Sequence, residues 1–252
     1  CALPISASYN NRIGVALTLL SARHDDEFVV LELGMNHPGE IDELAEAAAP
    51  EMGAITAVAE VHLEGVGSLE GVREAKAELI PHLPPRGLLA LNADNAQCMM
   101  LVDRHPGPVV TFGTSQNADL RVTDLRPLGD GWSFRALGKQ FLMPVGGRYN
   151  VMNAAAALVL ARELGIDAEA AREALAQFRL PGLRYQREQI GGVAYVQDCY
   201  NSNPSAMRAA AESFAAEPVA GRRIVVCGDM LELGESAPRL HREMGEHLAA
   251  CE

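Results

Sequence analysis

Short apolar runs alternate with helical segments from Glu27 to residue 112, and this alternation limits the possible folds more than any other feature of the sequence. Strands are predicted at 28–33, 53–58, 87–91 and 108–112, and helices at about 40–48, 68–80 and 95–103. Ser68 is a predicted N-cap, and Pro81 and the Pro84-Pro85 pair would end the helix that follows it. Strands and helices that alternate at this pace form a parallel sheet covered on both faces. We therefore expect an α/β nucleotide-handling core.

The pattern changes after residue 120 and again after residue 182. Three short strand-like runs between 120 and 144 are separated by turn sequences at 129–131 and 137–139, which predicts a small antiparallel sheet. Helices are predicted at 150–164 and 167–178. A new series then follows, with a strand at 193–197, a helix from Pro204, a strand at 223–226 and a helix from about Pro238. We expect residues 1–185 to form a central α/β domain and residues 186–252 to form part of a second, Rossmann-like domain.

Composition and charge exclude several classes of protein. The 252 residues carry a net charge of −12 with no basic block, which argues against nucleic acid or an anionic membrane as the main partner. The five cysteines have neither the close pairing of a zinc site nor the density of a secreted scaffold. The longest apolar run, 154–161, is far too short for a membrane span. We expect a cytoplasmic protein without membrane insertion.

Glu32, His62 and Lys76 are the first candidate site residues. Glu32 lies in the predicted strand at 28–33, His62 follows the next strand, and Lys76 lies in the helix after it. Ligands of open parallel sheets bind beyond the carboxyl ends of the strands, so a magnesium-phosphate site is one interpretation. A capping carboxylate, a loop histidine and a solvated lysine are the other interpretation. Spacing alone does not decide between them.

The local sequences around these residues resemble, in order, those of the Mur ligases. The matching runs lie at 9–20, 32–41, 62–68, 75–78, 92–95, 149–154, 181–184, 198–204 and 228–234. Among them, Asp-Cys-Tyr-Asn-Ser-Asn-Pro at 198–204 and Gly-Asp-Met-Leu-Glu-Leu-Gly at 228–234 are most similar to the branch of the family that adds D-alanyl-D-alanine. The resemblance spans nearly the whole chain after about residue 8.

The resemblance implies an ATP-dependent amide ligase. Such an enzyme joins D-alanyl-D-alanine to UDP-N-acetylmuramoyl-tripeptide through an acyl phosphate, in the cytoplasmic synthesis of peptidoglycan precursors on which cell shape and division depend. Its cofactors would be ATP and Mg²⁺, and the whole protein would be a monomer. Two alternatives stay open: another amide ligase of the superfamily, of the diaminopimelate-adding or folylpolyglutamate type, and a degenerate ligase without catalytic activity. The run at 198–204 argues against the first, and the presence of Glu32, His62 and Lys76 argues against the second.

The resemblance also implies roles for single residues. Glu32 and His62 correspond to magnesium ligands, and Lys76 to a lysine that is carbamylated and holds a second magnesium ion. The expected ATP contacts are Asn153, Arg184, Asp198 and Asn203, and the expected substrate contacts are Asn10 and Asn11. An asparagine that satisfies a helix end or a turn is the structural alternative for Asn153 and Asn203. The family often has histidine at the position of Tyr149, so no role is assigned to that residue.

One expected motif of the family does not occur in these 252 residues. A phosphate loop of the Gly-Lys-Thr type should precede Asn10, and no such run is found. We therefore expect a piece of a longer ligase that lacks the UDP-binding domain, the phosphate loop and most of the C-terminal domain, and that is inactive alone. The first five residues match the translated end of a common sequencing adapter, so we expect residues 1–6 to be an artefact.

Overall fold

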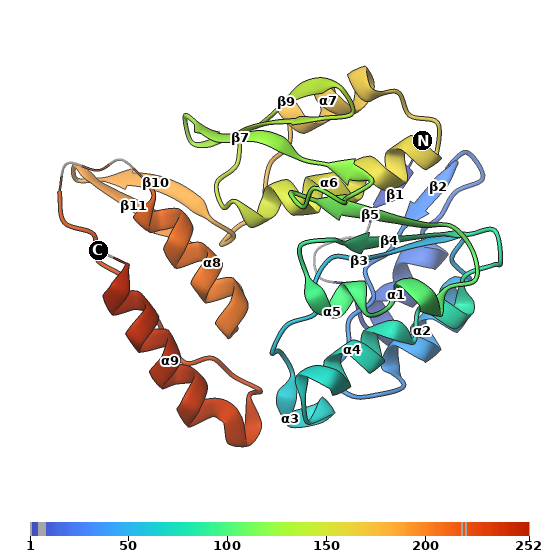
Figure 1. Cartoon of the computed structure of the whole chain (residues 1–252), viewed down its shortest axis with the longest axis horizontal. Helices are drawn as coiled ribbons and strands as arrows, with labels where there is room; N and C mark the ends of the chain where they lie inside the picture. Colours follow the sequence, from blue (N-terminus) through green and yellow to red (C-terminus); the bar gives the residue numbers. More distant parts are fainter. Residues whose placement is uncertain (1, 5–8, 218, 220, 252) are drawn as a thin grey trace.

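The computed structural model describes residues 2–4, 9–217, 219 and 221–251 (Figure 1). Its central sheet is parallel, with the strand order β3-β4-β5-β6. These strands are β3 (Met52–Ile55), β4 (Leu88–Asn92), β5 (Val109–Gly113) and β6 (Leu120–Arg121). Every residue of β4 is buried, as expected for a strand that is covered on both faces. The predicted α/β fold with a mainly parallel sheet is confirmed.

Alternate side chains of β4 enter two different apolar clusters, because successive residues of a strand point to opposite faces. Leu89 and Leu91 pack with helices α2, α4 and α5, whereas Leu88 and Ala90 pack with α6 on the opposite face (Figure 1). The helices of this part of the chain are α1 (Arg12–Leu20), α2 (Glu40–Ala48), α3 (Leu63–Val66), α4 (Leu69–Ala77), η1 (Ile80–His82), α5 (Ala96–Met99), η2 (Val102–Arg104), α6 (Tyr149–Glu163) and α7 (Ala168–Ala176).

A smaller antiparallel sheet covers the outer side of α6. It consists of β7 (Thr123–Leu128), β8 (Gly131–Ala136) and β9 (Lys139–Met143). Leu137 and Gly138 connect the last two strands with φ angles of 49° and 72°, the backbone that a two-residue hairpin turn requires. The hairpins predicted between residues 120 and 144 are confirmed.

In the C-terminal segment (residues 186–251) the strand predicted at 193–197 and the helices predicted from Pro204 and about Pro238 are confirmed, and the remainder differs from the prediction. The segment consists of β10 (Gln186–Ile190), β11 (Val193–Gln197), α8 (Pro204–Ala215), η3 (Gly234–Ser236) and α9 (Ala237–Ala250). β10 pairs antiparallel with β11, and its polar sequence had not been predicted as a strand. The strand predicted at 223–226 was wrong, because these residues pair with no other strand of the described chain. Apolar residues form a strand only where a neighbour can satisfy the backbone, and here Val226 is 93% exposed.

The strand predicted at 28–33 is shorter than expected. β2 (Phe28–Val30) pairs in parallel with β1 (Ala2–Pro4), and neither strand joins the central sheet. Of the residues expected to be an artefact, 2–4 form β1, and residues 1, 5 and 6 lie outside the described part of the chain. The origin of residues 1–6 therefore stays a prediction.

Cysteines of the described chain are not paired with one another. Cys98 is buried, Cys199 and Cys227 are exposed, and Cys251 is intermediate. Burial raises the pKa of the Cys98 thiol to about 11. In addition, no helix among the described residues has both the length and the apolar character that a membrane crossing needs.

The alternating burial of β4 predicts a large loss of stability on truncation of Leu91. Leu91→Ala should lower the free energy of unfolding by about 2–5 kcal/mol, because it opens a cavity between β4 and the helices. Leu128→Ala is the control, since Leu128 is 56% exposed, and its effect should stay within about 0.5 kcal/mol. Urea denaturation followed by circular dichroism measures both, and equal effects would contradict the assigned packing.

The burial of Cys98 predicts selective alkylation. Iodoacetamide at pH 8 should modify Cys199 and Cys227 in the native protein and leave Cys98 unmodified, because a buried thiol of raised pKa forms little thiolate. Peptide mass spectrometry distinguishes the three sites. After denaturation Cys98 should react as well; rapid modification of native Cys98 would show that the core around β4 opens easily.

Candidate active site

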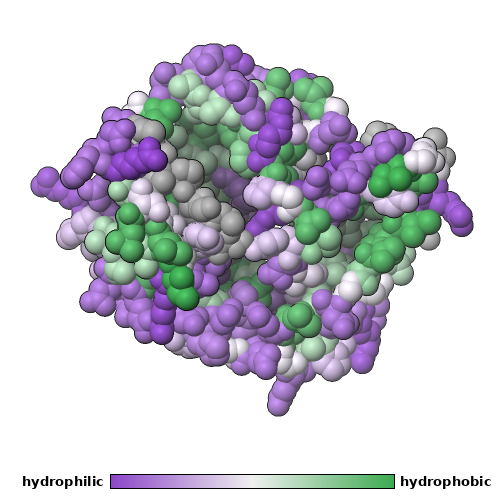
Figure 2. Space-filling view, turned by 180° about the vertical axis from the view of Figure 1, so that it is seen from behind, coloured by the Kyte–Doolittle hydropathy of each residue, from purple (hydrophilic) through white to green (hydrophobic). Residues whose placement is uncertain are grey.

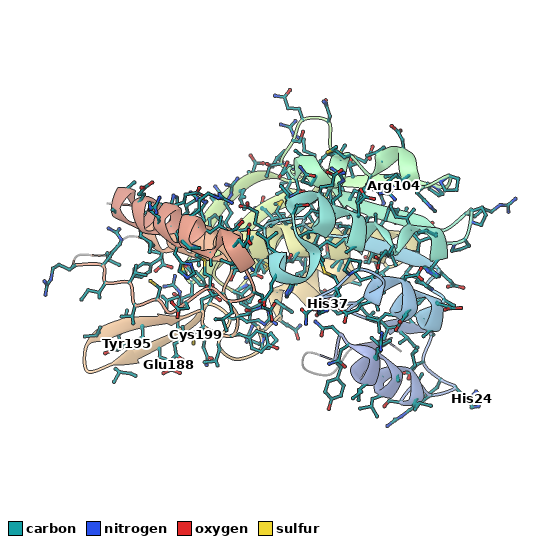
Figure 3. All side chains as sticks on the ribbon, turned by 90° about the horizontal axis from the view of Figure 1, so that it is seen from below. His24, His37, Arg104, Glu188, Tyr195 and Cys199 are labelled. Carbon is teal, nitrogen blue, oxygen red and sulfur yellow. The ribbon has the colours of Figure 1, made fainter. Side chains whose placement is uncertain are left out.

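A cleft of about 2150 Å³ is lined by residues from both the central sheet region and the C-terminal segment. Figure 2 shows the molecule hollowed near the middle of one face. In Figure 3, Tyr195 and Glu188 on the β10–β11 hairpin lie at one end of the molecule, and His24 lies at the other end. All of the site residues predicted from the sequence line this cleft: Asn10, Asn11, Glu32, His62, Lys76, Asn153, Arg184, Asp198 and Asn203.

Glu32 is positioned by the segment before α1 and by the loop that follows β2. Asn10 Nδ2 donates a hydrogen bond to Glu32 Oε1 at 3.0 Å, and the Gly34 amide donates to the Asn10 carbonyl at 2.7 Å. A Cβ atom at Gly34 would lie 2.8 Å from the end of the Asn10 side chain, so a larger residue there would displace Asn10 from Glu32. Asn10 was predicted to bind substrate, and in the structure its amide holds the Glu32 carboxylate.

Carboxylates fix the loop beyond Glu32. Glu40 accepts hydrogen bonds from the Asn36 and His37 amides at 2.6 and 2.9 Å, and these bonds lower the pKa of Glu40. Glu78 accepts from the Gly39 amide at 2.7 Å. Because the loop amides are satisfied by side chains, the chain leaves β2 along a defined path toward α2.

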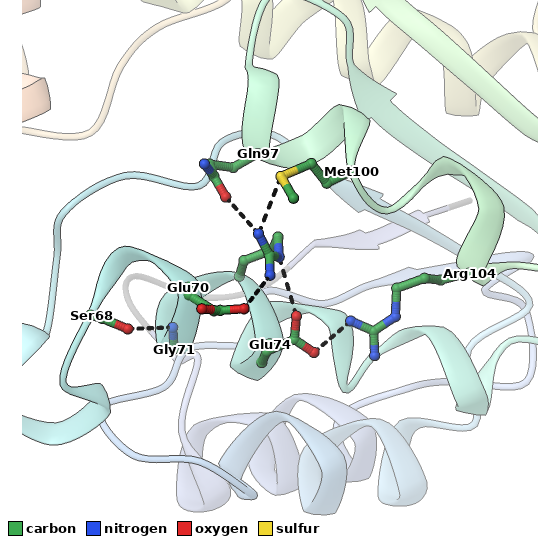
Figure 4. Close-up of polar contacts among 8 residues, drawn as sticks. Ser68, Glu70, Gly71, Glu74, Gln97, Met100 and Arg104 are labelled. Carbon is green, nitrogen blue, oxygen red and sulfur yellow. Dashed lines mark hydrogen bonds and ion pairs between the residues drawn. The ribbon is translucent and has the colours of Figure 1, made fainter.

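Lys76 lies on α4, a helix that also carries a network of polar contacts around Arg73 (Figure 4). Arg73 donates to Glu70, Glu74 and Gln97, and Arg104 donates to Glu74 at 2.6 Å. The helix begins at the predicted cap, where Ser68 Oγ accepts from the Gly71 amide at 3.0 Å. These contacts tie α4 to α5 and η2 and so hold the backbone that carries Lys76.

The amine of Lys76 lies in a poorly solvated position. Burial lowers the pKa of Lys76, while nearby Cys98 and Glu32 act in the opposite direction. Among the described residues, the structure gives the Lys76 amine no hydrogen-bond or ion-pair partner. A desolvated lysine has a larger neutral fraction than a solvated one, and the neutral amine is the nucleophilic form.

His62 is the N-cap residue of α3 and has a φ angle of 53°, which is uncommon for a residue other than glycine. Its Nδ1 forms a short contact with a carboxylate oxygen of Glu232, from the C-terminal segment. Sequence reasoning assigned no role to Glu232, although the residue lies in the run at 228–234 that carries the resemblance.

The donor set on this wall of the cleft fits a hard divalent cation under one condition. Glu32 offers carboxylate oxygens and His62 an imidazole nitrogen, but a lysine cation offers no ligand atom. In the described part of the chain, histidine, cysteine and acidic residues form no group of three that could hold a metal ion. The set therefore fits magnesium if Lys76 is carbamylated, because a carbamate replaces the cation by anionic oxygens.

Asn11 and Asn203 both cap helices. Asn11 Oδ1 accepts from the Ile13 and Gly14 amides at the start of α1, and Asn203 Oδ1 accepts from the Ala206 amide at 2.8 Å at the start of α8. These bonds occupy the side-chain oxygen and leave the Nδ2 group of each asparagine without a protein partner among the described residues. For Asn203 the structural alternative is therefore correct for the side-chain oxygen. In both residues the Nδ2 group remains available to donate to a ligand.

Asp198 lies at the junction of the two regions. It accepts from Tyr149 Oη at 3.3 Å and from the Tyr185 amide at 3.2 Å. Burial raises the pKa of Asp198, while these hydrogen bonds and the charge of Arg184 act in the opposite direction. Burial and the Asp198 charge also raise the pKa of Tyr149, so this phenol stays a donor. Its contact with Asp198 could not be found from the sequence, because the two residues are 49 positions apart.

Arg184 and Asn153 complete the lining. The Arg184 guanidinium lies over the Tyr200 ring at 4.3 Å, which restricts the arginine by a cation–π contact. Asn153 Nδ2 donates weakly to Asn150 Oδ1 at 3.3 Å, and Asn150 in turn donates to the Gly146 carbonyl at 2.8 Å. The cleft therefore has a cationic side chain and several amides near Asp198, and a carboxylate with a desolvated amine near β2.

Comparison with known proteins identifies the family. The sequence model of the Mur ligase middle domain matches residues 2–161, and that of the Mur ligase glutamate ligase domain matches residues 183–252. The UDP-N-acetylmuramoyl-tripeptide–D-alanyl-D-alanine ligase of Bacillus subtilis is 34% identical over 241 residues, which cover 94% of this chain and 52% of the relative. This chain thus spans about half the length of that relative.

Solved structures give the same result. The crystal structure of MurF from Acinetobacter baumannii matches with a TM-score of 0.91 at 30% identity, over 99% of this chain and 55% of that one. MurF ligase from Thermotoga maritima, solved in complex with ADP, matches with a TM-score of 0.86 at 27% identity, over 98% and 58% of the two chains. Two domain models of the family match most of the chain, and its fold matches that of a solved MurF over nearly every residue. This chain therefore belongs to the Mur ligase family.

Proposed function

We propose that this chain is part of an ATP-dependent amide ligase that adds D-alanyl-D-alanine to UDP-N-acetylmuramoyl-tripeptide. The observation that carries the proposal is a single cleft lined by Glu32, His62 and Lys76 and also by Arg184, Asp198 and Asn203. The names of the relatives with which nearly the whole chain aligns support the choice of substrates. The dipeptide and the nucleotide-linked tripeptide are thus the proposed partners, in the cytoplasm, and the whole protein is proposed to be a monomer.

The proposed division of the chain lies at residue 185. Residues 1–185 would form the central ATP-binding domain, and residues 186–252 part of the C-terminal domain. Leu183 and Tyr185 have φ angles of 63° and 47°, and the residues before them include Pro181 and Gly182. Such a joint concentrates the backbone change that closure over ATP would need in a few residues.

The reaction requires activation of a carboxylate, which is a poor electrophile. Phosphorylation by ATP gives an acyl phosphate, the free amine of D-alanyl-D-alanine attacks its carbonyl carbon, and phosphate leaves. Glu32, His62 and carbamylated Lys76 would hold magnesium, which when bound screens the negative charge between the two anionic reactants. Burial lowers the pKa of Lys76, which supports carbamylation because the neutral amine is the form that reacts with carbon dioxide.

The second group of residues would bind the nucleotide. Arg184 can donate two hydrogen bonds to a phosphate, and its stacking on Tyr200 orients the guanidinium. Asn153 would donate to the adenine, and Asn203 would donate through Nδ2 while its Oδ1 caps α8. Asp198 would accept a hydrogen bond from ATP beside its contacts with Tyr149 and Tyr185. Asn10 and Asn11, which also line the cleft, would contact the substrate.

Two other functions remain to be tested against this one. A ligase of the same superfamily with another amino-acid substrate would share the ATP chemistry and differ in the panel of amines that it accepts. A degenerate binding protein would not hydrolyse ATP in the presence of any amine. A substrate panel on the product of the whole reading frame separates the three.

Lys76→Ala in the product of the whole reading frame should reduce ligation by a factor of at least about 10³, because the oxygen ligands of a carbamate would be lost. Short carboxylic acids should restore part of the activity by replacing those oxygens. Release of phosphate in the presence of Mg²⁺, D-alanyl-D-alanine and the tripeptide substrate measures both effects. Lys139→Ala is the matched control, because Lys139 is an exposed lysine that pairs with Glu169 at 3.0 Å. Full activity of Lys76→Ala without additive would refute the role.

Arg184→Ala should raise the KM for ATP about tenfold or more, because two charge-assisted hydrogen bonds to phosphate would be lost. Arg184→Lys should recover only part of this loss, since lysine presents a point charge without the planar pair of donors. Initial rates at varied ATP measure the change. Arg179→Ala serves as the control, since within the described residues Arg179 donates only to the neighbouring Phe178 carbonyl. A KM for ATP unchanged in Arg184→Ala would remove the phosphate role.

A further inference from the structure

Residues 228–234, here called the docking loop, belong to the C-terminal segment and pack against the central region. Met230 and Leu233 are buried in the same apolar cluster as Leu63 and Val72. The Glu64 amide donates to the Glu232 carbonyl at 3.0 Å, and the backbone of Gly234 passes close to Glu64. The loop is therefore seated on the start of α3 by apolar contacts and by a backbone hydrogen bond, independently of the Glu232 side chain.

The Glu232 side chain adds a contact of a different kind, directed at one atom of His62. One of its carboxylate oxygens meets Nδ1 of the ring. Both residues have positive φ angles, 61° for Glu232 and 53° for His62, although neither is glycine. Backbone strain of this type persists where surrounding contacts determine the conformation, and here it directs two side chains from distant parts of the chain toward each other. His62 lines the cleft, and both side chains are partly accessible, 29% of His62 and 50% of Glu232.

We propose that Glu232 is a positioning residue for His62. A carboxylate accepts only, so a neutral His62 paired with it carries its proton on Nδ1 and keeps the Nε2 lone pair for a ligand in the cleft. A histidine that binds a metal commonly donates its other ring N–H to a carboxylate, which fixes both the tautomer and the ring orientation. This inference rests on the proposed metal role of His62.

A consequence concerns the two regions of the chain. His62 belongs to the central region, and Glu232 belongs to the C-terminal segment, so the ring is oriented only when the docking loop is seated. If a cation binds the oriented ring more tightly than the free ring, its binding stabilises the packed position of the docking loop by the same free energy. Glu232 thus couples closure of the cleft to the preparation of a cation ligand.

The tautomer of His62 tests the proposal without metal or activity. In the [¹⁵N]histidine-labelled product of the whole reading frame, at a pH where imidazole is neutral, His62 should be protonated at Nδ1. Glu232→Ala should shift it toward the Nε2–H form that free histidine prefers, and Glu232→Gln should keep much of the Nδ1–H form because its amide oxygen accepts. Glu235→Gln should change nothing, because Glu235 is an exposed neighbour whose side chain forms no hydrogen bond or ion pair within the described part of the chain. An unchanged tautomer in Glu232→Ala overturns the proposal.

Binding of Mn²⁺, followed by electron paramagnetic resonance, tests the consequence. Glu232→Ala should weaken the site about 10-fold or more, Glu232→Gln less, and Glu235→Gln not at all. The backbone bond to Glu64 and the burial of Met230 and Leu233 remain in each variant, and equal melting temperatures verify that the loop stays seated. If His62→Ala weakens Mn²⁺ binding and Glu232→Ala does not, the positioning role is overturned and the proposed function stands. If His62→Ala also has no effect, the metal role in the proposed function is overturned together with it.

Discussion

The burial of Met230, Leu233, Leu240 and Met244 against the helices under the parallel sheet is the contact on which the cleft depends. These side chains belong to the C-terminal segment, yet they share an apolar cluster with α2 and α4. Because apolar burial is the main favourable term in association, this contact determines where the second wall of the cleft lies. Asp198 and Asn203 face the cleft that also contains Glu32 and Lys76 because the docking loop and α9 occupy this cluster.

Charged residues of α4 contribute in different ways. Glu74 forms an exposed ion pair with Arg104, and such a pair stabilises a protein by about 0–1 kcal/mol and mainly orients side chains. Lys76, in contrast, is desolvated without a partner among the described residues, which opposes protonation of its amine. The packing of Val72, Ala75 and Ala77 keeps the helix in place despite this unfavourable position. A lysine kept in such a position is suited to chemistry that removes its charge.

Local patterns predicted the central region well. The alternation of strands and helices, the Ser68 cap and the hairpins near Gly138 depend on neighbours in sequence, so they can be read from short windows. The strand at 193–197 was predicted as well, but its partner β10 was missed because Gln186–Ile190 is polar, although Gly191-Gly192 between them is a local turn signal. The strand expected at 223–226 was wrong, because an apolar run forms a strand only where another segment supplies the hydrogen bonds. Site residues followed from the resemblance, whereas their contacts, such as that of His62 with Glu232, depend on how the two regions pack.

Asn11 and Asn203 explain why residue type alone did not separate structural from functional roles. An asparagine offers one acceptor and two donors, and a helix cap uses only the acceptor. The cap also orients the side chain, since Oδ1 is held by the amides of the first helical turn and Nδ2 then points in a direction fixed by the helix. A capping asparagine at the rim of a cleft is therefore a rigid donor, and the structural role is what makes the residue suitable for recognising a ligand.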